Sequence, residues 1–202
     1  MANLDNISSI SAASQQITSA TLGALVNLVG AIDFSNNATL ATIVLPASNE
    51  VITSFRTQKL TVPFNSVLTT IDVSGLTRLG GIFDVRRNTA LSTLLLPTSN
   101  EVFTFFFVTF TALTSLNASG LTKLGGNIQI TNNTSLTSLT LPVSSQLISF
   151  FNVGATALTS LDFSGLTNIG GLGIQIDLNP NLTTIVFPPT FSVDLNVANN
   201  AS

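Results

Sequence analysis

The chain of 202 residues contains no cysteine, histidine, tryptophan or tyrosine, and only 7% of its residues are charged. Without cysteine it has no disulfides and no thiolate metal sites. Without histidine and cysteine it lacks the usual general bases and most nucleophile–base pairs. The composition therefore argues against an enzyme, and we predict no catalytic residue, no cofactor and no bound metal.

Positive charge is also scarce. Nine acidic and six basic residues give a net charge of −3, and all the basic residues lie between Arg56 and Lys123. This balance is too weak to steer the protein onto nucleic acid or an anionic membrane. No stretch approaches the roughly 18 consecutive apolar residues of a membrane helix, and Met1–Asp5 has no signal-peptide character. We expect neither nucleic-acid binding nor membrane insertion.

What the chain has in abundance is apolar residues, which make up 45% of the sequence. Such a chain can build a large dry core, so disorder is not expected. Because charged residues are few, the surface must consist mainly of Ser, Thr, Asn and Gly.

The sequence is an internal repeat of two alternating motifs. One motif appears as LTTIDVSGLTRLGG at 68–81, LTSLNASGLTKLGG at 113–126 and LTSLDFSGLTNIGG at 158–171. The other appears as LATIVLP at 40–46, LSTLLLP at 91–97, LTSLTLP at 136–142 and LTTIVFP at 182–188. An eroded copy of the first type begins at Ile17. The repeating unit is therefore a pair of coils.

Together the motifs predict one repeat domain over residues 1–202, with a partial coil at 1–16. Eight coils then begin near residues 17, 40, 68, 91, 113, 136, 158 and 182. The spacing is 22 to 24 residues, except for one gap of 28 that contains an insertion within 53–67.

Apolar residues recur at fixed offsets in each coil, which indicates short strands with one buried face. Short alternations such as Ile128-x-Ile130 support strands, whereas no helical period persists. One coil cannot bury its own apolar side, so stacked neighbours must complete the core. The expected fold is a β-rich, right-handed solenoid with little or no regular helix. The residues eleven positions after each coil start are apolar throughout, and we expect them inside: Leu28, Val51, Leu79, Val102, Leu124, Leu147, Ile169 and Val193.

The coil junction Ile128-x-Ile130-x-x-Asn133-x-x-Leu136-x-x-Leu139-x-Leu141-Pro142 resembles the leucine-rich repeat, most closely its Treponema-type bacterial subclass. The resemblance implies a leucine-rich-repeat-like solenoid in a secreted or cell-surface bacterial protein that takes part in adhesion or recognition. A virion is a further location that the sequence leaves open. It leaves open whether a helical segment survives on the convex side and which strand lines the concave face.

An asparagine ladder belongs to this pattern, since a buried amide can satisfy backbone groups at the bend of a coil. The ladder positions in alternate coils are Asn37, Asn88, Asn133 and Asn179. Gln15, Thr111 and Thr156 fall near the same position in the other coils.

Carboxylates offer the remaining chemistry. Asp72 and Asp162 occupy equivalent positions four coils apart, about 19 Å by strand spacing, whereas glycosidase carboxylates lie roughly 5–9.5 Å apart. We interpret both as solvated strand positions. Glu50 and Glu101 follow equivalent prolines in two SNEV segments, and they are candidates for a partner site or for ordinary loop solvation.

The segment Phe103-Thr-Phe-Phe-Phe-Val-Thr-Phe110 is rich in aromatic residues. Strand alternation sends Phe106 and Val108 inward, so Phe105 and Phe107 should face outward, with Phe150 outward one coil pair later. Aromatic side chains exposed in register are candidate contacts for a protein or glycan. The alternative is that a flanking loop covers them.

Two hydroxyl-bearing residues follow the first leucine of most coils, as in Thr114-Ser115. Such ranks are typical of ice-binding solenoids, but those use a Thr-x-Thr alternation that this motif lacks. Ice binding is therefore a minor alternative to a soluble hydroxyl-rich turn.

The coil ends carry no evident cap, and an uncapped solenoid exposes core and strand edges. We therefore keep two functions open, one favoured by the family resemblance and one by the uncapped ends. The first is a non-catalytic surface module that binds a protein or glycan through a solenoid face. The second is a structural subunit of a filament, sheath or virion appendage, in which copies of the chain stack end to end.

Overall fold

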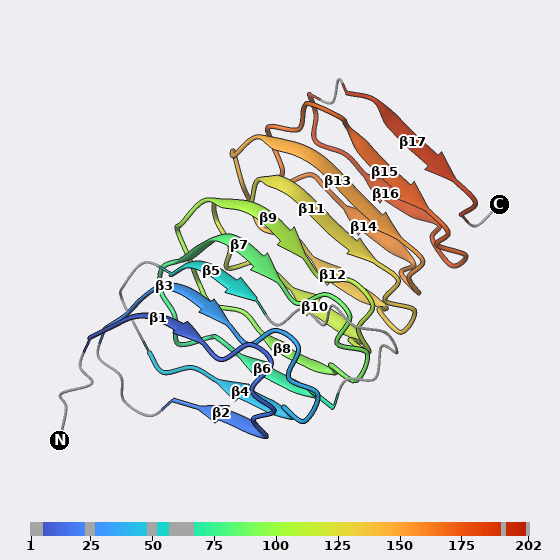
Figure 1. Cartoon of the computed structure of the whole chain (residues 1–202). Helices are drawn as coiled ribbons and strands as arrows, with labels where there is room; N and C mark the ends of the chain where they lie inside the picture. The colour runs from blue at the N-terminus through green and yellow to red at the C-terminus, as the bar shows by residue number, and fades with distance from the viewer. Residues whose placement is uncertain (1–5, 23–26, 48–51, 57–66, 191–192, 201–202) are drawn as a thin grey trace, which may run out of the picture.

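The chain folds as a β-solenoid of about seven turns with parallel strands (Figure 1). The computed structural model describes residues 6–22, 27–47, 52–56, 67–190 and 193–200, and none of these residues is helical. The prediction of a β-rich solenoid with little helix is confirmed. The insertion centred on Lys59 and Pro63, and Glu50, lie outside the described residues.

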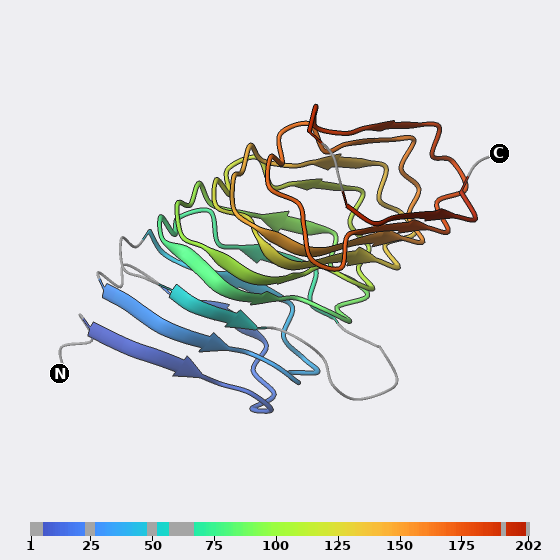
Figure 2. The ribbon, with the colours of Figure 1, turned by 90° about the horizontal axis from the view of Figure 1, so that it is seen from above.

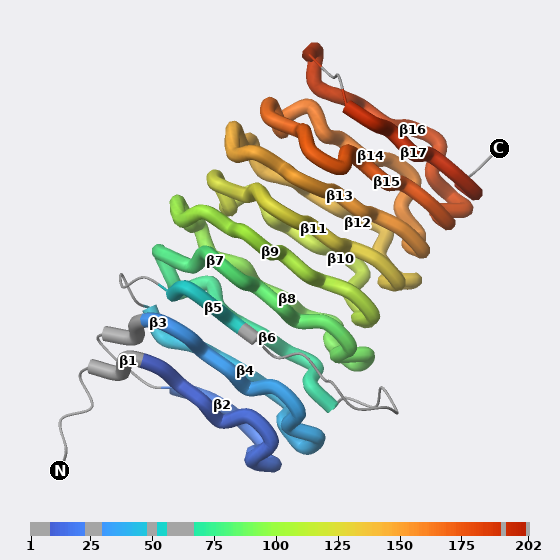
Figure 3. Tube along the Cα trace, turned by 45° about the horizontal axis from the view of Figure 1, so that its top comes forward, coloured from blue at the N-terminus to red at the C-terminus, as the bar shows by residue number. Residues whose placement is uncertain are grey.

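One side of the solenoid is a nine-stranded parallel sheet in which odd-numbered strands follow one another in order. Its strands are β1 (Asn6–Ser11), β3 (Asn27–Asp33), β5 (Ile52–Arg56), β7 (Leu79–Asp84), β9 (Phe103–Phe107), β11 (Gly126–Thr131), β13 (Ile148–Gly154), β15 (Ile174–Asp177) and β17 (Leu195–Ala198). Successive coils stack along one axis, so the two termini lie at opposite ends (Figure 3).

The other side consists of three-residue strands from the L-x-x-L segments. They are β2 (Ser19–Thr21), β4 (Thr42–Val44), β6 (Thr70–Asp72), β8 (Thr93–Leu95), β10 (Ser115–Asn117), β12 (Ser138–Thr140), β14 (Ser160–Asp162) and β16 (Thr184–Val186). They form parallel sheets of four, two and two strands. The view from above shows them as a layer behind the long sheet (Figure 2).

The core fills the space between these two layers. The second leucine of each L-x-x-L segment is the middle residue of a short strand and points inward, as Leu116 and Leu161 do, each 1% exposed. From the long sheet, Phe55, Phe83 and Phe106 are fully buried and stack in a column, with ring centroids 5.4 and 5.2 Å apart. Neighbouring coils thus complete one another's interior.

Each coil turns sharply just after its long strand. The residue before the ladder position has a positive φ in each described corner, including non-glycine residues such as Phe110, Asn132 and Leu178. Asn133 is fully buried there; its Nδ2 donates to the Val108 carbonyl at 2.7 Å, and its Oδ1 accepts from the Thr111 N–H at 2.9 Å. The amide therefore links one coil to the previous one.

The other ladder asparagines are buried and hydrogen-bonded in the same corners. Asn179 Oδ1 accepts from the Thr156 N–H and hydroxyl, at 3.1 and 2.6 Å. Asn37 Nδ2 donates to the Ala12 and Phe34 carbonyls, both at 2.8 Å, and Asn88 Nδ2 donates to the Val85 carbonyl at 2.9 Å.

A β-bulge explains why the repeating unit is two coils. Strand β9 has one extra residue, Thr104, between the residues that pair with Gly81 and Ile82. Strand β13 has Ser149 at the equivalent place. The carbonyls of these extra residues lie directly against Gly126 and Gly171 of the next coil, where a side chain would collide. Bulged coils therefore alternate with Gly-Gly coils.

The bulge corrects one sequence-based expectation. Val102 and Leu147 are not in the core: they are 45% and 52% exposed. Because one extra residue reverses the alternation of a strand, the next residues, Phe103 and Ile148, fill the interior instead. In the Gly-Gly coils Leu79 and Leu124 are buried at this position, as expected, and Ile169 is partly buried.

Candidate binding surface

The outer face of the nine-stranded sheet carries an open groove of about 520 Å³. Its middle coil contributes Gly125 and Gly126, which have no side chains to fill the space. The coils on either side supply the walls, with Val102 and Phe105 on one side and Leu147 on the other. We call this depression the groove; it is lined by Val102, Phe103, Thr104, Phe105, Gly125, Gly126, Asn127, Gln146, Leu147 and Ser149.

The groove is apolar at its walls and uncharged throughout. Phe105 is 41% exposed, and Val102 and Leu147 are about half exposed. None of the lining residues is ionisable. Its volume falls within the range of ligand sites, roughly 300–1,000 Å³. The groove therefore suits a partner that offers an apolar, neutral surface.

The predicted aromatic residues lie together beside this groove. Phe105 and Phe150 both pair with Asn127, from opposite sides, in the registers of β9–β11 and β11–β13. Phe107 lies two residues after Phe105, and the two rings are 5.6 Å apart in a tilted arrangement. Phe107 and Phe150 are half-buried, so Phe105 is the most accessible of the three.

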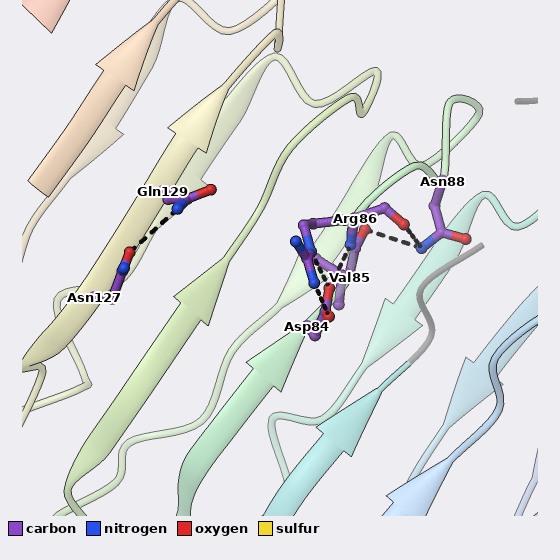
Figure 4. Close-up of polar contacts among 6 residues, drawn as sticks. All are labelled: Asp84, Val85, Arg86, Asn88, Asn127 and Gln129. Carbon is purple, nitrogen blue, oxygen red and sulfur yellow. Dashed lines mark hydrogen bonds and ion pairs between the residues drawn. The ribbon is translucent and has the colours of Figure 1, made fainter. Parts of the chain in front are cut away.

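An ion pair borders the aromatic residues on the side of β7. Arg86 donates from Nε and Nη2 to the two carboxylate oxygens of Asp84, at 2.9 and 2.8 Å (Figure 4). Its guanidinium also lies 4.6 Å from the centre of the Phe107 ring. The hydrogen bonds that Arg86 donates to Asp84 raise the pKa of Arg86 above its ordinary value; burial acts in the opposite direction, and the negative charge of Asp84 adds to the increase. The charges of Arg86 and Asp84 compensate each other, and the contact between the guanidinium and the ring stabilises the position of Phe107.

The remaining acidic candidates are spread over other parts of the surface. Glu101 accepts from Arg78 Nε at 2.7 Å, so this carboxylate is engaged in an ion pair between neighbouring coils. Asp72 and Asp162 each accept from a serine two residues later, Ser74 and Ser164. Hydrogen bonds from the hydroxyl and from the backbone N–H of Ser164 lower the pKa of Asp162. Among the described residues, no three acidic side chains gather where a metal ion could bind.

The short-strand face carries the hydroxyl ranks. The first residue of each short strand is Ser or Thr, in register from coil to coil within each sheet, as Thr42, Thr70 and Thr93 are. The third residue varies between polar and apolar types, as at Asp72 and Leu95. This face therefore lacks the regular Thr-x-Thr array on which ice binding depends.

Sequence reasoning proposed Phe105, Phe107 and Phe150 as contact residues, and of these only Phe105 lines the groove; it did not propose Val102 and Leu147, which form walls of the groove. Because both residues are apolar, the sequence assigns them to the core. The signal for their exposure is that coils with Gly-Gly alternate with coils with Pro, since each Gly-Gly pair faces a bulge in the coil before it. No described segment forms a helix of the length and hydropathy that crossing a membrane requires. Comparison of the chain with protein-family models, with curated proteins and with solved structures finds no match.

Proposed function

We propose that this protein is a non-catalytic recognition module, a leucine-rich-repeat-like solenoid of about eight coils that acts outside the cell or at a bacterial cell surface. It binds its partner through the outer face of the nine-stranded sheet. The groove beside Phe105 is the observation that carries this proposal.

Two properties of the groove support recognition. Exposed apolar side chains gathered in a concave site cost free energy in water, and a bound partner relieves that cost. Six of the ten residues that line the groove lie in strands β9, β11 and β13 of one continuous sheet. The other four, Val102, Gly125, Gln146 and Leu147, stand one or two residues before those strands. A rigid site loses little conformational entropy when it binds, so more of the contact energy contributes to affinity.

The chemistry of the chain supports binding without catalysis. The groove holds no ionisable residue, and two acidic side chains described above are each paired with an arginine, Glu101 with Arg78 and Asp84 with Arg86. A general acid or base needs a titratable group within hydrogen-bonding reach of the reacting atoms.

Retention on an extracellular surface tests this function. Labelled full-length protein is applied to bacterial cells and to an extracellular matrix that contains both proteins and polysaccharides. We expect the double variant Phe105→Ser, Leu147→Ser to lose retention and a matched double variant on the opposite face, Ser138→Ala, Thr184→Ala, to keep it. Equal retention of both variants would refute the proposal.

A second candidate function is a structural subunit that stacks through its coil ends. Strand β17 lies at one edge of the long sheet, and its Leu195 and Val197 are 41% and 46% exposed. An exposed parallel strand can pair with a strand of another copy. Sedimentation at several concentrations, combined with negative-stain microscopy, tests this function; a stable monomer at high concentration eliminates it.

A further inference from the structure

A row of amide side chains crosses the outer face of the long sheet next to the groove. Four consecutive strands, β11, β13, β15 and β17, place an amide at the same register position. We call Gln129, Asn152, Gln175 and Asn196 the amide row. Since neighbouring strands lie about 4.8 Å apart, the row presents one amide per strand at a constant spacing.

The amides of the row leave hydrogen-bonding capacity unused. Gln129 Nε2 donates to Asn127 Oδ1 at 3.3 Å (Figure 4), and Gln175 Nε2 donates to Asp177 Oδ2 at 3.4 Å, both within one strand. Bonds of this length are weak. Asn152 Oδ1 is buried and has no hydrogen-bond partner among the described residues. Its amide can turn toward a ligand without breaking a bond to that oxygen.

The row is also continuous with the groove. Asn127 lines the groove and accepts from Gln129, the first member of the row. In strand β9 the row position is taken by Phe107, and in β7 by Asp84, whose charge Arg86 compensates. One face thus combines a neutral apolar groove with a line of uncharged amide donors and acceptors, beside which the carboxylate of Asp177 accepts from Gln175.

We propose that this face binds a neutral, extended polysaccharide that runs along the axis of the solenoid; this inference rests on the recognition function proposed above. The hydroxyls of a sugar donate and accept hydrogen bonds, as do the amides of the row. The C–H face of a sugar ring packs against Phe105, since an aromatic face carries partial negative charge. The groove holds one end of the bound chain, and the amide row binds the rings that follow.

The period of the row is what favours a polymer. A ring in an extended polysaccharide is about as long as the separation of two strands, about 4.8 Å, so successive rings meet successive amides. The surface of a globular protein partner with irregular loops and helices offers no such period. Protein interfaces also concentrate their binding energy in Trp, Tyr and Arg, and the groove and the row contain none of these residues.

Co-sedimentation with insoluble polysaccharides tests the inference. The probes are three neutral polymers, cellulose, chitin and β-1,3-glucan, and acidic pectate for comparison. The full-length protein is compared with Gln129→Ala, Gln175→Ala and with the opposite-face control Ser138→Ala, Thr184→Ala. Circular dichroism and urea unfolding establish that each variant is folded as the parent is.

We expect binding to at least one neutral polymer, weakened about tenfold or more in the amide variant and unchanged in the control. Added salt should have little effect, because screening acts on charges. The inference is overturned by preference for pectate, by equal loss in both variants, or by no binding to any neutral polymer. If matrix retention depends on Phe105 while no neutral polymer binds, the recognition function stands and the polysaccharide inference fails. If neither assay shows binding, both proposals fail.

Discussion

The hydroxyl of Thr111 donates to Oδ1 of Asn133 at 2.8 Å, which joins the corner of one coil to the corner of the next. The same contact recurs one coil pair later between Thr156 and Asn179, at 2.6 Å. Both partners are buried in each pair. These corners are where the solenoid depends on a polar side chain for its stability.

Replacing Asn133 by Ala should therefore lower the free energy of unfolding by about 2–4 kcal/mol, because buried backbone groups at the corner lose their partners. Thr134→Ala, at the exposed next position, should change it by less than about 0.5 kcal/mol. Urea unfolding of both variants checks this. A similar small effect in both would show that the ladder contributes little.

Gly126→Ala should be among the most damaging single substitutions. Gly126 has φ 69°, and an added Cβ would collide with the Thr104 carbonyl of the bulge. The backbone must move to relieve that contact, so we expect the free energy of unfolding to fall by more than about 3 kcal/mol. At Gly170 a Cβ meets only the end of the Leu147 side chain, at 3.1 Å. Gly170→Ala should therefore lower the free energy of unfolding much less. Thermal unfolding of the two variants measures the difference.

Leu178→Asn should stabilise the protein. Leu178 is half exposed and has φ 57°, a conformation that asparagine tolerates better than leucine. Asn36, Asn132 and Asn199 already occupy the equivalent corners. We expect the free energy of unfolding to rise by about 0.5–1 kcal/mol. The control Leu172→Asn, at an exposed site without positive φ, should leave it unchanged. A loss of stability in Leu178→Asn would contradict this account of the corner.

Ser164→Ala should raise the pKa of Asp162 toward its ordinary value, because the Ser164 hydroxyl is the main cause of the lowering. In the parent protein a lowered folded-state pKa adds stability above the unfolded value of about 3.9, and this contribution disappears as pH falls through the folded value. Carboxyl titration by NMR measures the shift. An unchanged titration midpoint in Ser164→Ala would exclude the hydroxyl as the cause.

The sequence predicted the solenoid and its inward-facing leucines because both depend on strict periodicity. It also placed Phe106 and Val108 in the core, where both are fully buried. It did not predict the groove, because the bulge residues Thr104 and Ser149 look like ordinary strand residues. The extra residue turns Val102 and Leu147 toward water, and no residue type beside the bulge distinguishes it from a regular strand. Gly81 and Gly126 belong to strands β7 and β11 of the long sheet.

The pairing of bulged coils with Gly-Gly coils sets the smallest step by which the molecule can grow or shrink. Removing residues 91–135, one full unit of 45, keeps the alternation and should leave a shorter protein that still folds. Removing a single coil would bring two bulged coils, or two Gly-Gly coils, next to each other. A bulge carbonyl would then lack the glycine against which it packs, or a glycine would lack its bulge carbonyl. Evolution by duplication, and design by extension, must then proceed in pairs.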